Sequence, residues 1–213
     1  EEEGEAPSLP PIEEWERKKV DDIEPKELID SILIGMPLPV IFTVRSQNEQ
    51  GFFPGSEEER IEILSMAIDA KVAWIDLELN IPEKQRKELT EKANKNGVKV
   101  IASEHNHDGM PSDQDIIQLV EENQSKGDIV KFCGQCTNHH DALQVVNAAW
   151  DLKNKELNYS IMGLSSGGDW ARLHAPLFNQ NMVFATMQNE FRLSDKGLIN
   201  VRDLREAWTL LEY

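Results

Sequence analysis

The stretch GDIVKFCGQCTNHH contains three sets of side chains that could do chemistry. Lys131 lies alone among apolar residues, Cys133 and Cys136 form a Cys-x-x-Cys pair, and His139 and His140 follow closely. A buried amine can attack a carbonyl, a Cys-x-x-Cys pair can exchange electrons, and cysteines with histidines can bind zinc. A nucleophilic lysine, a redox pair and a metal site are therefore all open.

Lys131 has a chemical role only if its amine is buried. The plainer interpretation is that a strand lysine extends to solvent or pairs with a carboxylate. Burial beside other cations would instead favour a neutral amine, which could form a Schiff base with a carbonyl. An iminium acidifies the neighbouring carbon, and His105, at the end of the apolar run VKVIASEH, could remove that proton. Lys131 and His105 form a candidate catalytic pair, whereas His107 has no assigned role.

Cys133, Cys136, His139 and His140 would supply four zinc ligands. Zinc modules draw their ligands from two separated knuckles, whereas these four residues crowd one link between a strand and a helix. The two histidines also fall where a helix is expected to begin, which favours a surface role. A thioredoxin-like site would fit the position of the cysteines but not the lysine before them. Metal binding is therefore the less favoured alternative.

Alternating helical and strand-like segments must position these residues. The chain predicts helices at 24–35, 56–70, 82–97, 111–127, 138–155, 169–180 and 200–213, and strands at 37–45, 72–79, 98–105, 128–133, 159–164 and 182–187. Such alternation builds a parallel sheet from βαβ units. No Gly-x-Gly-x-x-Gly follows a strand, so an α/β fold of the (β/α)8 TIM barrel type is favoured over a doubly wound sheet.

A full barrel needs eight strands, and residues 1–23 are acidic with hardly any apolar run. We therefore expect the first one or two strands to be missing, or degenerate around EEWERKKVDD. Residues 1–23 would form an irregular acidic segment and residues 24–213 a single catalytic barrel domain. Catalytic groups gather at the C-terminal ends of barrel strands, where Arg45, His105 and Arg172 are expected.

Composition excludes several classes of partner. The chain has 22 Lys and Arg against 39 Asp and Glu, a formal charge of -17, so nucleic acid would be repelled over most of the surface. No apolar run approaches the roughly 20 residues of a membrane span. The acidic N-terminus lacks the basic and apolar regions of a secretory signal, so we expect a cytoplasmic protein. An anionic small molecule would have to be held by a few converging cations.

Six segments taken in order resemble type I 3-dehydroquinate dehydratase, the Schiff-base lyase of the shikimate pathway. They are PVIFTVRS, WIDLEL, IASEHNHDGMPS, DIVKF, MGLSSGG with ARL, and FATM, and the resemblance covers residues 37–213. It implies a (β/α)8 barrel, often a homodimer, that converts 3-dehydroquinate to 3-dehydroshikimate and water without metal or cofactor. Lys131 would form the imine, His105 would be the general acid and base, and Glu49 would orient His105.

The resemblance also implies which residues contact the substrate. Arg45, Arg172 and Ser194 match substrate-binding positions, and the guanidinium of Arg172 would bind a carboxylate. Two departures stand out, because the family's Glu-x-Arg pair has no placed counterpart in EEWER and a loop glutamine is replaced by Leu198. A divergent barrel, either an aldolase-like Schiff-base enzyme or a non-catalytic homologue, is therefore kept as the alternative.

Overall fold

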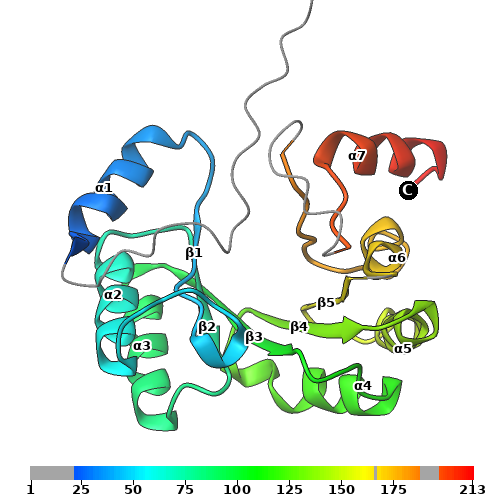
Figure 1. The fold of residues 1–213 in the computed structure, drawn as a ribbon, viewed down its shortest axis with the longest axis horizontal. Helices are drawn as coiled ribbons and strands as arrows, with labels where there is room; N and C mark the ends of the chain where they lie inside the picture. Colours follow the sequence, from blue (N-terminus) through cyan, green and yellow to red (C-terminus); the bar gives the residue numbers. More distant parts are fainter. Residues whose placement is uncertain (1–21, 166, 188–196) are drawn as a thin grey trace, which may run out of the picture.

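The computed structural model describes residues 22–165, 167–187 and 197–213, in which helices and strands alternate (Figure 1). The helices are α1 (Pro25–Gly35), α2 (Glu57–Asp69), α3 (Glu83–Asn96), α4 (Asp113–Glu122), α5 (His139–Leu152), α6 (Gly168–Leu173) and α7 (Val201–Leu210). The strands are β1 (Ile41–Phe42), β2 (Trp74–Glu78), β3 (Lys99–Asn106), β4 (Ile129–Cys136) and β5 (Tyr159–Ser165). Two short 3-10 turns, η3 (Gln47–Glu49) and η4 (Gln124–Lys126), follow β1 and α4. All seven predicted helices and the first five predicted strands are present, although several begin or end at other residues than predicted.

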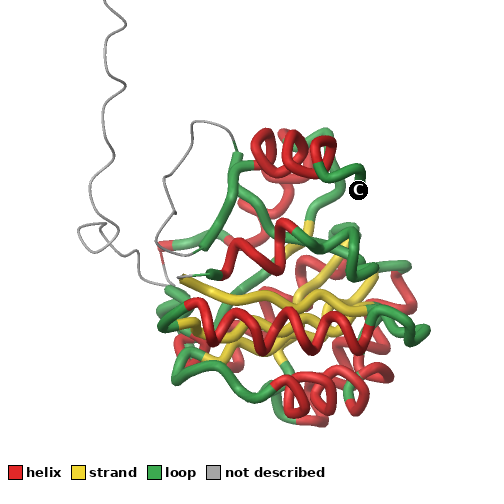
Figure 2. The backbone as a smooth tube through the Cα atoms, turned by 90° about the vertical axis from the view of Figure 1, so that its right-hand side faces the viewer, coloured by secondary structure: helices red, strands yellow, loops and turns green. Residues whose placement is uncertain are grey.

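The five strands form one parallel sheet in the order β1-β2-β3-β4-β5, so each strand pairs with the next one along the chain. Figure 2 shows the strands running between helices. A doubly wound sheet reverses its strand order at a switch point, whereas a barrel winds in one direction. The α/β class is confirmed, and the winding is that of consecutive barrel strands.

Local sequence explains where several helices begin and end. The side chain of Ser56 accepts a hydrogen bond from the backbone of Glu59, and the Glu59 carboxylate accepts one from the backbone of Ser56. This capping box starts α2. Asn138 accepts from the first turn of α5 in the same way. Gly97 ends α3 with a φ of 73°, a left-handed conformation that suits glycine.

Two clusters of buried apolar side chains lie between the sheet and the helices. Ile75 of β2 belongs to the cluster that contains Leu64 of α2. Val130 and Phe132 of β4 belong to the cluster formed with α4 and α5. Successive side chains of a strand point to opposite faces. Lys131 therefore points to the inner face of the sheet. Its apolar neighbours in the sequence, Val130 and Phe132, point to the opposite face and pack against the helices.

The first predicted strand is shorter in the structure than expected. Of residues 37–45, only Ile41–Phe42 pairs with a neighbouring strand. Pro37 and Pro39 lack the backbone N–H that a ladder needs, which limits pairing to the residues after them.

The prediction of a sixth strand at 182–187 is wrong. Within the described residues, this segment forms only an isolated bridge, between Thr186 and Asn200. Instead, β5 is bonded both by the backbone, where the N–H of Asn181 donates to the carbonyl of Tyr159 at 3.0 Å, and by side chains. The N–H of Ile161 donates to the side chain of Gln180 at 2.7 Å, and the N–H of Tyr159 donates to the side chain of Asn181 at 2.8 Å.

The sixth helix also ends earlier than predicted, at Leu173 instead of residue 180. Pro176 explains the early end, because proline cannot donate to the carbonyl four residues before it and disfavours helical geometry at the preceding residue.

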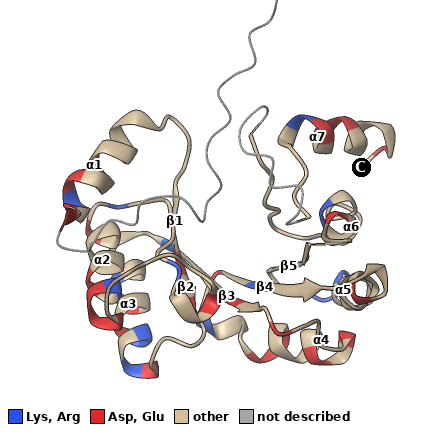
Figure 3. Cartoon of the chain, in the orientation of Figure 1, with Lys and Arg blue, Asp and Glu red and all other residues tan. Residues whose placement is uncertain are grey.

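Acidic side chains are spread over the outer helices, as on α2, α3 and α4 (Figure 3). Much of the negative charge predicted from composition therefore lies on the helical layer. Across the described ranges, none of the helices combines the length and the apolar character that crossing a membrane requires.

Gly51 closes the turn that follows β1, and we expect it to tolerate no side chain. A Cβ at Gly51 would lie 2.0 Å from the carbonyl oxygen of Arg45, whereas a Cβ at Gly35 would meet nothing within 4 Å. Gly51→Ala should lower the free energy of unfolding by about 1–3 kcal/mol in a urea titration, as overpacking does. The control Gly35→Ala should change it by less than about 1 kcal/mol. Equal losses in the two variants would contradict this turn geometry.

Candidate active site

Lys131 is buried on the inner face of β4, with 4% of its surface exposed. Its Nζ lies 2.7 Å from Nε2 of His105 and 4.8 Å from the centre of the Phe184 ring. The aromatic face and the imidazole are the neighbours that distinguish this amine from a lysine extended to solvent. The structure thus supports the buried-amine interpretation of the sequence.

His105 lies on the neighbouring strand β3, where Ser103 is in register with Lys131 and His105 with Cys133. Its Nδ1 is 2.7 Å from Oε2 of Glu49. When Glu49 is ionised its carboxylate can only accept a hydrogen bond, so Nδ1 then carries the proton and the lone pair of Nε2 faces the amine. The structure therefore joins Lys131, His105 and Glu49, three residues far apart in the sequence, into one chain of polar contacts, here called the relay, along which a proton could pass.

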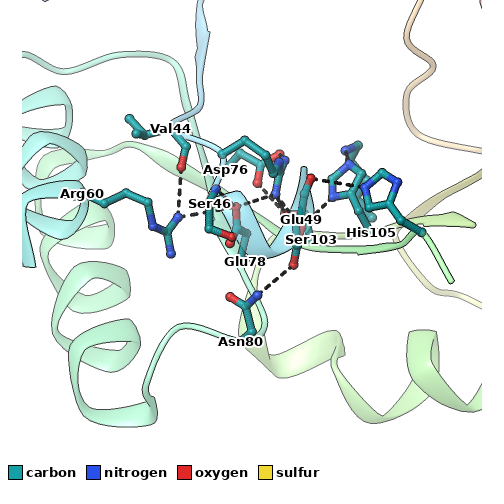
Figure 4. A network of polar contacts seen from close by, with 12 residues as sticks. Val44, Ser46, Glu49, Arg60, Asp76, Glu78, Asn80, Ser103 and His105 are labelled. Carbon is teal, nitrogen blue, oxygen red and sulfur yellow. Dashed lines mark hydrogen bonds and ion pairs between the residues drawn. The ribbon is translucent and has the colours of Figure 1, made fainter. Parts of the chain in front are cut away.

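Glu49 is the last residue of the turn η3 and is 6% exposed. Oε2 accepts hydrogen bonds from Arg45 at 2.9 Å as well as from His105, and Oε1 accepts one from Asn80 at 3.2 Å (Figure 4). Burial, followed by the charge of Glu78, raises the pKa of Glu49 to about 7 although Arg45 opposes the shift. The carboxyl that holds His105 therefore titrates near neutral pH.

Arg45 is surrounded by carboxylates at the base of the site. Its Nη1 donates to Glu49, to Glu78 at 3.1 Å and to Ser103 at 3.0 Å, and its Nη2 donates to Asp76 at 2.9 Å. Ser103 also donates to Asp76. Sequence reasoning had placed Arg45 at the substrate; in the structure its guanidinium binds these protein groups, and 17% of its side chain is exposed.

The sequence analysis assigned no role to Asp76, Glu78 and Ser103, which the structure places around Arg45. Although burial opposes ionisation, Lys131 and then Arg45 hold the pKa of Asp76 below its usual value. Strand alternation could have identified these residues, because side chains two positions apart lie on the same face of a strand. Asp76 and Glu78 share one face of β2, and Ser103 and His105 share one face of β3. Polar residues on the same face of neighbouring strands should converge.

Arg172 of α6 is buried, with 1% of its surface exposed. Its Nη1 donates to the carbonyls of Gly163, Gly168 and Gly197 at 2.8, 2.7 and 3.0 Å. Its Nε donates to the carbonyl of Phe184 at 3.1 Å, so Phe184 contacts both Arg172 and Lys131. The structure brings this predicted cation close to the relay.

Ser194, the remaining predicted substrate contact, lies outside the described residues. Gly197, the first described residue after it, is the one whose carbonyl accepts from Arg172.

The two cysteines lie three residues apart on one strand, so they face opposite sides of the sheet and cannot form a disulfide without moving the backbone. Both are free and buried. The ring of His139 lies beside that of Trp170, with centroids 5.0 Å apart and the ring planes inclined at 45°. No group of three or more metal-binding side chains is found in the part of the chain that the structure describes. The alternative of a Cys and His metal site gains no support here.

Cys133 and Cys136 nevertheless differ sharply. Burial opposes ionisation of Cys133, but Lys131 and His105 lower its pKa to about 6. Burial, with Asp141 adding to it, raises the pKa of Cys136 to about 11. The position of Cys133 beside the relay was not expected from the sequence, where it was considered only as a metal or redox residue.

We expect the thiolate absorbance of the folded protein to show this difference. Cys136→Ala, which retains Cys133, should show a thiolate transition near pH 6, because the cations beside Cys133 stabilise its anion. Cys133→Ala, which retains Cys136, should show its transition only in strongly alkaline solution. A common transition in both variants would contradict the placement of Cys133 beside Lys131 and His105.

Comparison with known proteins gives several matches. The family described as Type I 3-dehydroquinase matches residues 18–213. A 3-dehydroquinate dehydratase of Methanococcus maripaludis strain C5 is 32% identical over 178 residues, which are 82% of this chain and 78% of the relative. One of Geobacillus sp. strain WCH70 is 28% identical over 213 residues, which are 95% and 80% of the two chains.

Solved structures agree with the barrel-type winding. The type I 3-dehydroquinate dehydratase of Clostridium difficile, solved with covalently modified comenic acid, superposes with a TM-score of 0.78 at 25% identity, over 87% of this chain and 74% of that one. The enzyme of Geobacillus kaustophilus has the same TM-score at 22% identity, over 89% and 75%. The fold is therefore TIM-barrel-like.

The family match begins ahead of α1 and ends at the last residue, so it contains all five described strands and the three residues of the relay. The chain belongs to the type I 3-dehydroquinase family.

Proposed function

We propose that this protein is a 3-dehydroquinate dehydratase, a hydro-lyase that converts 3-dehydroquinate to 3-dehydroshikimate and water in the shikimate pathway. The observation that carries the proposal is the buried contact between the amine of Lys131 and His105, in a chain of this family. Only residues of the chain are needed: Lys131 as nucleophile, His105 as acid and base, and Glu49 as the group that orients His105.

The first half of the proposed reaction forms an iminium. His105 Nε2, 2.7 Å from Nζ, accepts a proton from the Lys131 ammonium and leaves a neutral amine. The amine attacks the substrate ketone to give a carbinolamine. His105 returns its proton to the carbinolamine hydroxyl, which leaves as water and gives the iminium, so that Nε2 can again accept a proton. The positive nitrogen then attracts the electron pair that is released when a proton leaves the adjacent carbon.

The second half eliminates the hydroxyl. His105 Nε2 removes the proton from the carbon beside the iminium, and the electron pair forms an enamine. The enamine expels the hydroxyl from the next carbon, which takes the proton from His105 and leaves as water. Hydrolysis of the remaining iminium releases the product and restores Lys131. Glu49 stabilises the imidazolium that exists between the two proton transfers.

The arginines and Ser194 complete the proposal as substrate contacts. Arg172 would attract the substrate carboxylate from its buried position beside Phe184. Arg45 would contact substrate through the exposed part of its side chain while holding Glu49 with the rest. A few buried cations would in this way hold an anion inside a protein whose formal charge is -17.

The family resemblance supports three further parts of the proposal. Residues 24–213 would form the catalytic domain behind the acidic segment 1–23, the protein would act in the cytoplasm, and two copies would form a homodimer. Light scattering on the purified protein measures the last of these directly.

Borohydride reduction tests the Schiff base. Mixing the protein with 3-dehydroquinate and borohydride should give a covalent adduct, because hydride reduces the iminium to a stable amine, and peptide mass spectrometry should locate it on Lys131. Lys131→Ala should give no adduct, whereas Lys126→Ala, which changes an exposed lysine near the start of β4, should react as the wild type does. A folded wild type without adduct would favour the divergent, non-dehydratase barrel.

Glu49 should shape the pH dependence of the reaction. Its pKa of about 7 means that the carboxylate available to His105 increases as the pH rises from 6 to 8, so kcat/KM of the wild type should rise over that range. Glu49→Gln should lower kcat by about 10- to 100-fold, as loss of an orienting partner does, and should flatten the rise. Glu58→Gln, an exposed change on α2, is the control. An unchanged profile in Glu49→Gln would assign the rise to another group.

A further inference from the structure

His107 lies just beyond the end of β3, two residues after His105. Its Nε2 is 3.2 Å from the backbone carbonyl oxygen of Glu49. A carbonyl can only accept, so Nε2 of His107 carries the hydrogen and donates it. The rings of His105 and His107 are nearly parallel, with an angle of 10° and centroids 6.2 Å apart. Both histidines therefore reach Glu49 from the same strand end, one at its side chain and one at its backbone.

Glu49 needs more than its side-chain contacts to stay in place. Its carboxylate is buried close to Glu78 and Asp76, both of which disfavour its negative charge. Arg45 is shared among all three acids. When Glu49 ionises, movement of the turn η3 away from the other carboxylates would relieve the repulsion and would break the contact with His105.

We propose that His107 is a positioning residue, which holds the backbone of Glu49 so that the Glu49 carboxylate stays against Nδ1 of His105. The inference rests on the proposed function only for its kinetic consequence. Nε2 of His107 donates whether the ring is neutral or protonated, so this tether persists over the pH range in which Glu49 ionises. The backbone contact and the carboxylate contact form a two-point attachment of the turn η3 to β3.

Kinetics of His107 variants test the positioning. His107→Ala should lower kcat about tenfold, the scale of one lost hydrogen bond, and should change KM less than about twofold. His107→Gln, whose amide N–H can donate to the same carbonyl, should recover kcat to within about threefold of the wild type. His140→Ala, which removes an exposed histidine at the start of α5, should leave both constants unchanged.

A double-mutant cycle separates positioning of Glu49 from a general structural role. In the Glu49→Gln background, His107→Ala should lower kcat by less than about twofold, because the carboxylate that it positions is already gone. The same tenfold loss in both backgrounds would overturn the proposal, and so would a His107→Gln variant no better than His107→Ala.

The Nδ1 proton of His105 gives a measurement that does not depend on turnover. In proton NMR spectra, hydrogen bonding to Glu49 should move this resonance far downfield in the wild type, in His107→Gln and in His140→Ala. The resonance should move upfield or vanish in His107→Ala. An unchanged resonance in His107→Ala would overturn the proposal. A wild type without dehydratase activity would defeat the proposed function, while the NMR comparison would still decide the role of His107.

Discussion

The ion cluster around Arg45 is the interaction on which the site depends. One guanidinium lies within 3.1 Å of carboxylate oxygens of Glu49, Asp76 and Glu78, all of them buried. Removing one partner from such a cluster leaves buried charge without compensation, which is strongly unfavourable. The cluster joins the turn after β1 to β2 and, through Ser103, to β3. Three consecutive strand ends are thereby tied to one cation.

The same cluster shifts the pKa values of two neighbouring carboxyl groups in opposite directions. Asp76 has Lys131 and Arg45 beside it, and its pKa is lowered in spite of its burial. Glu49 is desolvated and repelled by Glu78, and its pKa is raised to about 7. Neighbouring acids with opposite shifts are typical of sites that move protons. Asp76 can supply a constant negative charge near the amine of Lys131, whereas the ionisation of Glu49 can change as His105 gains and loses a proton.

Residues placed by strand pairing could be predicted from the sequence, whereas residues placed by turns or tertiary contacts could not. Lys131 and His105 were found because each lies on an apolar strand, and strand alternation with parallel pairing is enough to bring them together. The role of Glu49 came from the resemblance alone, since the position of its side chain depends on a turn. Strand alternation could also have indicated Asp76, Glu78 and Ser103, whereas the contact of His107 with Glu49 depends on tertiary packing that no local pattern records. The same applies to residues 182–187, because the pairing of β5 with the side chains of Gln180 and Asn181 could not be read from strand propensity.

A crystal structure of the borohydride-reduced complex would test the central claim most directly, that the Lys131, His105 and Glu49 relay carries out the chemistry. The account predicts density continuous from Nζ of Lys131 to the former ketone carbon. It also predicts that Nε2 of His105 faces the adjacent carbon while Nδ1 remains hydrogen-bonded to Glu49. Substrate held away from Lys131, or a His105 ring turned away from the reacting carbon, would contradict it.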